Sequence, residues 1–291
     1  MTPLPRALIL ALAFCFGLPL VQISGTLHGQ AVPTDSILAI AHRLCAEATL
    51  LANQGLHDEA ETRLWQTLSI REKALGLDHP DVALTLHNLG FIYNAQGRYE
   101  EAEPLLRRAL IIRETAFGPQ HLEVALTLNS LAFTYGVQSR YDKAEPLYER
   151  ALAIDEIVLG PNHLEVAHIL SNLGMLYDDL GRYAEARMIY ERVLVIREAA
   201  LGSSHPNVAN ILINLASLYH HQGRYTEAVP LYRRALDIRR AELGPEHSDT
   251  SLALENLILA CELLFALPDV VQEQRSITAP ESMAMLCRLS P

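Results

Sequence analysis

A repeat of 42 residues is the feature of this sequence that most constrains its fold. Glycine, histidine and alanine each recur five times at this step, at three different positions of the repeat. The glycines are Gly76, Gly118, Gly160, Gly202 and Gly244; the histidines are His79, His121, His163, His205 and His247; the alanines are Ala60, Ala102, Ala144, Ala186 and Ala228. A fixed period of roughly 20–50 residues indicates an array of stacked units, because one such unit cannot bury its apolar faces alone.

Each repeat is predicted to hold two helices. Apolar residues recur at helical spacing along residues 80–95, and Pro80 suits the first helical position, where its missing N–H costs nothing. Gly97 is the expected stop signal, and a second helix is expected over 99–117, ended by Gly118. The equivalent first helices are 122–137, 164–179 and 206–221, and the counterparts of Gly97 are Gly55, Gly181 and Gly223, with Ser139 as the exception. The sequence therefore predicts an all-α fold.

These residues resemble a known repeat. The pattern is carried by Leu89, Gly90, Tyr93, Ala102 and Ala109, which resembles the tetratricopeptide repeat. The period of 42 and the segments 102–105 (AEPL) and 144–152 (AEPLYERAL) are similar to the longer variety found in kinesin light chains. The resemblance covers about 36–266. It implies a right-handed superhelical solenoid of stacked antiparallel helix pairs, with about five repeats followed by a C-terminal capping helix.

The N-terminal residues 1–31 have the layout of a secretory signal peptide. Arg6 is followed by an uncharged apolar run over 7–20 and then by small polar residues, so cleavage is expected between Gly25 and Ala31. The alternative is an uncleaved N-terminal helix that anchors the chain in a membrane. We therefore expect an exported protein, periplasmic or secreted, and the short signal with Arg-rich, Lys-poor usage favours a bacterium. Because the chain is expected to be exported and no heptad coiled coil precedes the repeats, we do not expect the motor-linked role of kinesin light chains to carry over.

The tail 267–291 follows the repeats and is predicted to contain a short amphipathic helix within 278–289. In an oxidising compartment Cys261 and Cys287 are close enough in sequence to pair if the tail folds back. Buried free thiols in helices are the alternative interpretation, and Cys45 makes the number of cysteines after the signal odd.

Composition and motifs exclude several classes of function. The chain has 34 Asp+Glu against 23 Lys+Arg and a net charge of −11, which argues against a nucleic-acid-binding protein. No phosphate loop, dinucleotide-binding glycine pattern, nucleophile elbow or HExxH motif occurs, so we expect no catalytic residue, no cofactor and no enzyme. The recurring histidines cannot converge on one metal ion, because stacked repeats lie at least ~8–10 Å apart. They are interpreted as packing or capping groups.

The function is therefore expected to be recognition. The resemblance implies that the first helices line a concave groove that binds a peptide or a partner segment. By position in the repeat, the groove residues are predicted to be Leu84, His87, Asn88, Phe91, Asn94, Asn129, Phe133, His168, Asn172, Met175, Asn210 and Asn214. Side-chain amides suit pairing with a peptide backbone, and bonding of the same amides to a neighbouring helix is the alternative.

Charge sharpens this prediction. The first helices of repeats two to five contain no Lys or Arg but do contain carboxylates, so a neutral to basic, partly apolar protein partner is expected. The arginines of the second helices are expected on a solvated outer face; they are Arg107, Arg108, Arg150, Arg192, Arg233 and Arg234. Two alternatives stay open: a structural or assembly subunit whose groove is filled by its own tail, and an enzyme with an unrecognised site.

Overall fold

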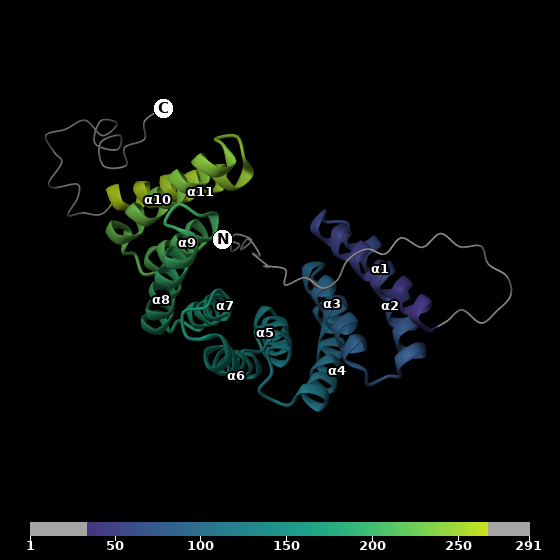
Figure 1. Cartoon of the computed structure of the whole chain (residues 1–291). Helices are drawn as coiled ribbons and strands as arrows, with labels where there is room; N and C mark the ends of the chain where they lie inside the picture. Colours follow the sequence, from purple (N-terminus) through teal and green to yellow (C-terminus); the bar gives the residue numbers. More distant parts are fainter. Residues whose placement is uncertain (1–33, 267–291) are drawn as a thin grey trace, which may run out of the picture. The chain divides into compact units, whose positions relative to one another are not determined.

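The computed structural model describes residues 34–266, which form eleven helices and no strand (Figure 1). The helices are α1 (Thr34–Asn53), α2 (His57–Leu75), α3 (Pro80–Ala95), α4 (Tyr99–Phe117), α5 (Leu122–Val137), α6 (Tyr141–Leu159), α7 (Leu164–Asp179), α8 (Tyr183–Leu201), α9 (Pro206–His221), α10 (Tyr225–Leu243) and α11 (Ser248–Phe265). The predicted signal peptide and tail lie outside the described residues. The predicted first helices and the second helix over 99–117 are confirmed.

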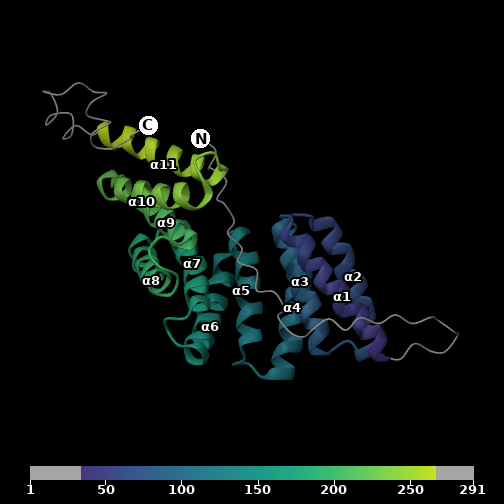
Figure 2. The same ribbon diagram turned by 45° about the horizontal axis from the view of Figure 1, so that its top comes forward.

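The chain divides into two compact units, 1–154 and 155–291, and the division falls within α6. In the first unit, consecutive helices pack side by side, α1 on α2, α2 on α3, α3 on α4 and α4 on α5 (Figures 1 and 2). In the second unit the same order continues from α7 to α11. None of the helices in the described part of the chain is long and apolar enough to cross a membrane.

The helices α3, α5, α7, α9 and α11 each begin after a histidine. The Nδ1 atoms of His79, His121, His163, His205 and His247 accept hydrogen bonds of 3.1–3.2 Å from the backbone N–H two residues later. These histidines therefore cap the first helices, as predicted. The helices α3, α5, α7 and α9 each end two residues before a residue with positive φ, as α3 does before Gly97 with φ of 75°. Within 34–266, Ser139 is the one non-glycine residue with positive φ, at 58°.

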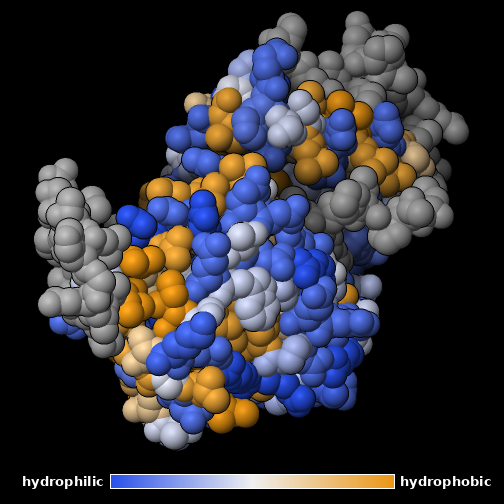
Figure 3. Space-filling model, turned by 90° about the vertical axis from the view of Figure 1, so that its right-hand side faces the viewer, coloured by the Kyte–Doolittle hydropathy of each residue, from blue (hydrophilic) through white to orange (hydrophobic). Residues whose placement is uncertain are grey.

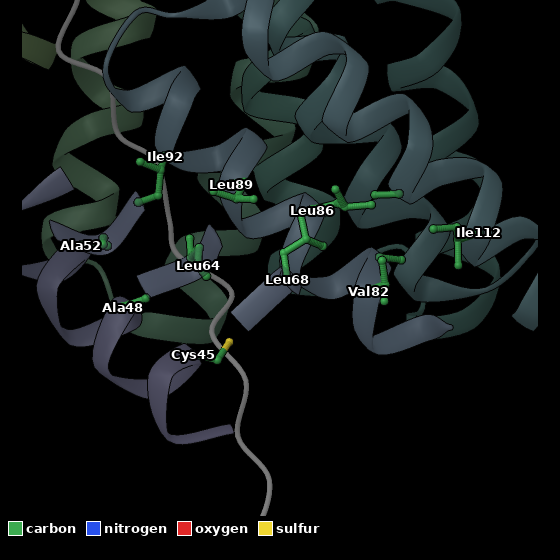
Figure 4. Packing of buried hydrophobic residues seen from close by; sticks show 13 residues of the cluster. Cys45, Ala48, Ala52, Leu64, Leu68, Val82, Leu86, Leu89, Ile92 and Ile112 are labelled. Carbon is green, nitrogen blue, oxygen red and sulfur yellow. The ribbon is translucent and has the colours of Figure 1, made fainter. Parts of the chain in front are cut away.

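Small apolar residues let the two helices of a pair approach closely. A Cβ atom added at Gly90 would lie 2.6 Å from Cγ of Leu106, and one at Gly174 would lie 2.5 Å from Cε1 of Tyr190. The core of the first unit is built from such contacts between α1, α2, α3 and α4 (Figure 4). In the second unit, Leu212 and Ile238 belong to the cluster between α9 and α10.

Apolar side chains also reach the surface of the first helix pair. Figure 3 views the side of the molecule on which α1 and α2 lie, where hydrophobic patches alternate with hydrophilic side chains. Exposed apolar residues of this pair are Ile40, Leu50 and Trp65. Of these, Trp65 keeps a polar contact, because its Nε1 donates to the hydroxyl of Tyr93 at 3.1 Å.

Candidate partner-binding surfaces of the first helices

The predicted groove residues of the first unit lie on α3 and α5, and we call them the first-unit surface: Leu84, His87, Asn88, Phe91, Asn94, Asn129 and Phe133. Leu84 and Phe91 are half-buried, whereas the other five side chains are buried. Access for a partner is therefore concentrated at the two apolar side chains of α3.

Two amide side chains of this surface already form contacts between neighbouring helices. Asn94 Oδ1 accepts a hydrogen bond from the hydroxyl of Thr134 at 3.0 Å and so joins α3 to α5. Asn88 Nδ2 lies 3.7 Å from Sγ of Cys45 and joins α3 to α1. Both contacts are the bonds between neighbouring helices that the alternative interpretation of the asparagine row predicts. A partner that binds these amides would have to compete with the contacts that they already make to Thr134 and Cys45.

The second-unit surface consists of the predicted residues on α7 and α9, which are His168, Asn172, Met175, Asn210 and Asn214. Asn210 is buried and its Oδ1 accepts a hydrogen bond from Arg239. The other four side chains are half-buried. This surface therefore offers more accessible polar groups than the first-unit surface.

The histidines of the two surfaces are neutral at physiological pH. Burial, followed by the charge of Arg197, lowers the pKa of His168 to about 4. Burial, followed by the charge of Arg113, holds the pKa of His87 well below its usual value. Nδ1 of His87 is buried and has no hydrogen-bond partner among the described residues. Neither imidazole therefore contributes a positive charge to the surface of the first helices.

A row of arginines that contacts the starts of the first helices was not predicted. Arg71, Arg113, Arg197 and Arg239 follow the 42-residue step on the second helices. Arg71 Nη1 donates to the carbonyl of Asp81, Arg113 Nη1 to that of Glu123 and Arg197 Nη1 to that of Asn207, at 2.9–3.1 Å. Each guanidinium thus ties a second helix to the first turn of the next first helix. The recurrence of Arg at the 42-residue step could have indicated a structural role for these residues. It was missed because charged side chains are rarely buried in a protein.

The charge that compensates each arginine differs between repeats. Arg113 Nη2 pairs with Glu123 at 2.6 Å, and Arg239 Nη1 pairs with Asp249 at 2.7 Å. Asn207 occupies the equivalent place beside Arg197, and burial lowers the pKa of Arg197 to about 10. One repeat holds Asp155 instead of arginine. The arginine positions therefore recur regularly, but the charge at each position and the charge of its partner differ between repeats.

The outer arginines are partly exposed, but most of them are also paired, which the sequence did not predict. Arg107 is 61 % exposed and fits the prediction of a solvated face. Arg108, Arg150, Arg192 and Arg234 are 37–39 % exposed and pair with Glu72, Glu114, Glu156 and Glu198 of the preceding second helix, at 2.5–2.6 Å. Arg108 Nη2 also donates to the carbonyl of Leu77 at 3.0 Å. The glutamates lie one repeat back rather than on the same helix, so spacing along one helix did not reveal these contacts.

No group of three His, Cys, Asp or Glu side chains within 34–266 is arranged to hold a metal ion. Cys45 is buried on α1, where its Sγ lies 3.7 Å from Nδ2 of Asn88. Cys261 is buried on α11, and because Cys287 lies outside the described residues, their pairing stays a prediction.

Comparisons with known proteins agree with this architecture. No curated protein matches the chain. A putative kinesin light chain of Podosopora anserina with TPR-like repeats is similar in structure at 25 % identity and a TM-score of 0.60, over 71 % of this chain and 97 % of that one. A second structure of this kind from the same organism has 26 % identity and a TM-score of 0.57, over 73 % and 98 %. BtubC (BKLC) from P. vanneervenii shares the fold at 22 % identity and a TM-score of 0.58, over 90 % and 94 %.

The family model of the tetratricopeptide repeat matches the chain in five overlapping segments. The matched residues are 38–115, 81–157, 123–199, 165–240 and 207–265. Together they span nearly all of the described residues. The chain belongs to the tetratricopeptide repeat family, and its structural neighbours are repeat proteins of the kinesin-light-chain kind.

Proposed function

We propose that this protein is a non-enzymatic interaction scaffold whose first helices bind an extended segment of a partner protein. Membership of the tetratricopeptide repeat family, which generally serves protein–protein interaction, supports the general class. The observation that carries the proposal is the half-buried set of apolar and amide side chains on these helices. It comprises Leu84, Phe91, Asn172, Met175 and Asn214. Apolar side chains of a partner would pack on Phe91 and Met175, and its backbone would pair with the amides.

Charge supports a neutral to basic segment. The helices α3, α5, α7 and α9 carry no Lys or Arg, while α7 ends with Asp178 and Asp179. The neutral imidazole of His168 adds no positive charge to α7. Two charges 4 Å apart near a protein surface interact by roughly 4 kcal/mol at an effective dielectric constant of 20, and by less in salt. Even a fraction of this energy would separate basic from acidic peptides.

A peptide array screened with the full chain tests the proposal. We expect enrichment of apolar peptides that carry Lys or Arg, and weaker binding after Asn172→Ala. The matched control is Asn162→Ala, because Asn162 lies exposed in the loop before α7. Enrichment of acidic peptides, together with unchanged binding by Asn172→Ala, would contradict both the charge argument and the assignment of the surface.

A chain that lacks 268–291 separates partner binding from self-occupation of the same surface. If the surface is open to a partner, the truncated and full chains should bind array peptides equally. Stronger binding by the truncated chain, with a melting temperature lowered by several degrees, would favour the assembly subunit whose tail fills its own surface.

We also propose that the protein is exported after removal of its first 25–31 residues. The charge and hydropathy pattern of the N-terminus supports this location. Cell fractionation with mass spectrometry of the N-terminus is the test. Mature chain in the periplasm or medium is the expected result, and chain found only in the cytosol with residues 1–25 intact would refute it.

A further inference from the structure

The first helix of the array has one buried side and one exposed side. The buried side packs toward α2 and α3 through small side chains at helical spacing, which are Cys45, Ala48 and Ala52. The opposite side carries Ile40, Arg43, Glu47 and Leu50, which follow one another at steps of three or four residues. We call these four residues the end stripe, because among the described helices α1 is the first of the array (Figures 1 and 2).

The end stripe is more apolar than the end of a repeat array usually is. Leu50 is 62 % exposed and Ile40 is 41 % exposed. The outer face of a terminal repeat is normally polar, because no further repeat covers it. Figure 3 shows hydrophobic patches among hydrophilic side chains on this side of the molecule. Exposed apolar side chains at the end of the array favour association with a further chain.

Two opposite charges lie between the apolar side chains of the end stripe. The side chain of Arg43 is 69 % exposed, and that of Glu47 is 42 % exposed. Along α1 the stripe therefore runs apolar, positive, negative and apolar. Both charged groups are accessible to a second protein.

The ion pairs of the end stripe within the chain are long. Nε of Arg43 lies 3.6 Å from Oε1 of Glu47, and Nε of Arg63 on α2 lies 3.4 Å from Oε2 of the same carboxylate. The arginine–glutamate pairs that join second helices measure 2.5–2.6 Å. Two arginines thus share one carboxylate without a short contact. Arg43 can accept a second carboxylate without giving up a short ion pair.

We propose that the end stripe pairs with the same stripe of a second copy of this chain, with the two α1 helices antiparallel. Around a two-fold axis, the numbers of facing residues on two antiparallel helices add to a constant. This constant is the same for Ile40 with Leu50 as for Arg43 with Glu47. A single arrangement therefore joins two apolar pairs and two ion pairs. A parallel arrangement would place Arg43 on Arg43 and Glu47 on Glu47, where like charges repel.

A second copy fits the end stripe better than a partner of one charge does. A basic or an acidic segment would match one of the two charged groups and oppose the other, whereas a second copy matches both. The contact is small, because α1 has 20 residues and is therefore about 30 Å long and 10 Å wide. Interfaces that bury less than roughly 1,200 Å² are commonly weak, so we expect a dimer that dissociates in the micromolar range.

This dimer goes beyond the proposed function. The end stripe lies on α1, whereas the candidate partner-binding residues lie on α3, α5, α7 and α9. Each copy would thus keep its own surface for a partner. A partner with two suitable segments would bind the dimer more tightly than a single copy, because its second segment binds at a high effective concentration.

Sedimentation velocity of the purified protein at increasing concentration tests the proposal. We expect the sedimentation coefficient of the native chain to rise toward that of a dimer. Arg43→Glu and Glu47→Arg each place like charges at both crossings, so each variant alone should dimerise at least about tenfold more weakly. An equimolar mixture of the two variants restores opposite charges at both crossings and should dimerise as the native chain does.

Arg107→Glu on α4 is the matched control for these variants. Arg107 is 61 % exposed and lies 3.6 Å from Glu103 four residues earlier, much as Arg43 lies beside Glu47. Its charge reversal should leave the dimer unchanged. Leu50→Ser should weaken the dimer without changing any charge. Circular dichroism checks that every variant is folded.

Three results would overturn the proposal. A native chain that sediments as a monomer at every concentration would show that no second copy binds the end stripe. A dimer that persists in both charge variants would place the contact on another surface. If both variants and their mixture stay monomeric, the two charges do not meet across a two-fold axis. None of these results bears on peptide binding by the first helices, which the peptide array tests separately.

Discussion

Replacing Arg113 by alanine should destabilise the array at one interface between repeats. Arg113 is 1 % exposed, and its guanidinium donates to the carbonyl of Glu123 at 3.1 Å and to the hydroxyl of Thr127 at 2.6 Å. Hydrogen bonds from a charged donor contribute about 1.5–3 kcal/mol each, and removal of the buried stem adds a packing loss. Against this, the desolvation cost of the guanidinium disappears. We expect a net loss of about 2–4 kcal/mol in the free energy of unfolding.

The expected loss in the free energy of unfolding is smaller than for a fully buried ion pair, because the side chain of Glu123 is 42 % exposed. After the substitution its carboxylate returns to water rather than remaining buried without a partner. Arg113→Met, which keeps the apolar stem, should therefore cost less than Arg113→Ala. The control is Arg107→Ala on the same helix, whose side chain is 61 % exposed and whose loss should change stability by at most about 0.5 kcal/mol.

Urea unfolding followed by circular dichroism measures these differences, and hydrogen exchange locates them. Because the stability of a repeat array is a sum of local and nearest-neighbour contributions, exchange should accelerate most in α4 and α5. If Arg113→Ala unfolds within about 0.5 kcal/mol of the native chain at an unchanged urea slope, the arginine row does not hold the repeats together.

Three further predictions concern single positions of the array. Asp155→Asn should stabilise the protein above pH 6 by up to about 3 kcal/mol, because the folded pKa of about 6 exceeds the ordinary 3.8; the gain should shrink as the pH falls through 6 and vanish near pH 4 in pH-dependent thermal melts. Ser139→Gly should raise the free energy of unfolding by about 0.5–1 kcal/mol, and with it the melting temperature, because the φ of 58° suits glycine. An unchanged melting temperature would contradict strain at this position. Ala144→Leu should cost about 1–3 kcal/mol in urea unfolding, because Ala144 is fully buried, and a neutral result would mean that the second helix has room at this position.

The period of the sequence predicted the helices to the residue at several places. The first helices over 80–95 and 164–179 begin after a histidine and end before a residue with positive φ, and both signals are local. Capping by His79 could be predicted because it directly precedes the first helical residue, where a side-chain acceptor can bind an N–H of the first turn. Local chemistry therefore suffices for the boundaries of these elements.

Contacts between repeats were harder to predict. The ion pair of Arg108 with Glu72 joins residues 36 positions apart, which no periodicity along one helix can reveal. The burial of Arg113 follows from the shape of the interface between α4 and α5, and its charge suggested the opposite location. The candidate surfaces show the same difficulty, because Asn94 is a groove residue by position yet is buried through its bond to Thr134.

Photo-crosslinking tests the central claim, that the first helices bind a partner segment, most directly. A photoreactive phenylalanine analogue is placed at Phe91 or Met175 on the candidate surfaces, and at Ile111 or Val195 as exposed positions on the second helices. Irradiation takes place in the organism that makes the protein, and crosslinked partners are identified by mass spectrometry. We expect one recurring partner segment, carrying apolar and basic residues, from Phe91 and Met175 and none from Ile111 or Val195. The same partner crosslinked only from Ile111 and Val195 would contradict the account, because binding would then use the second helices.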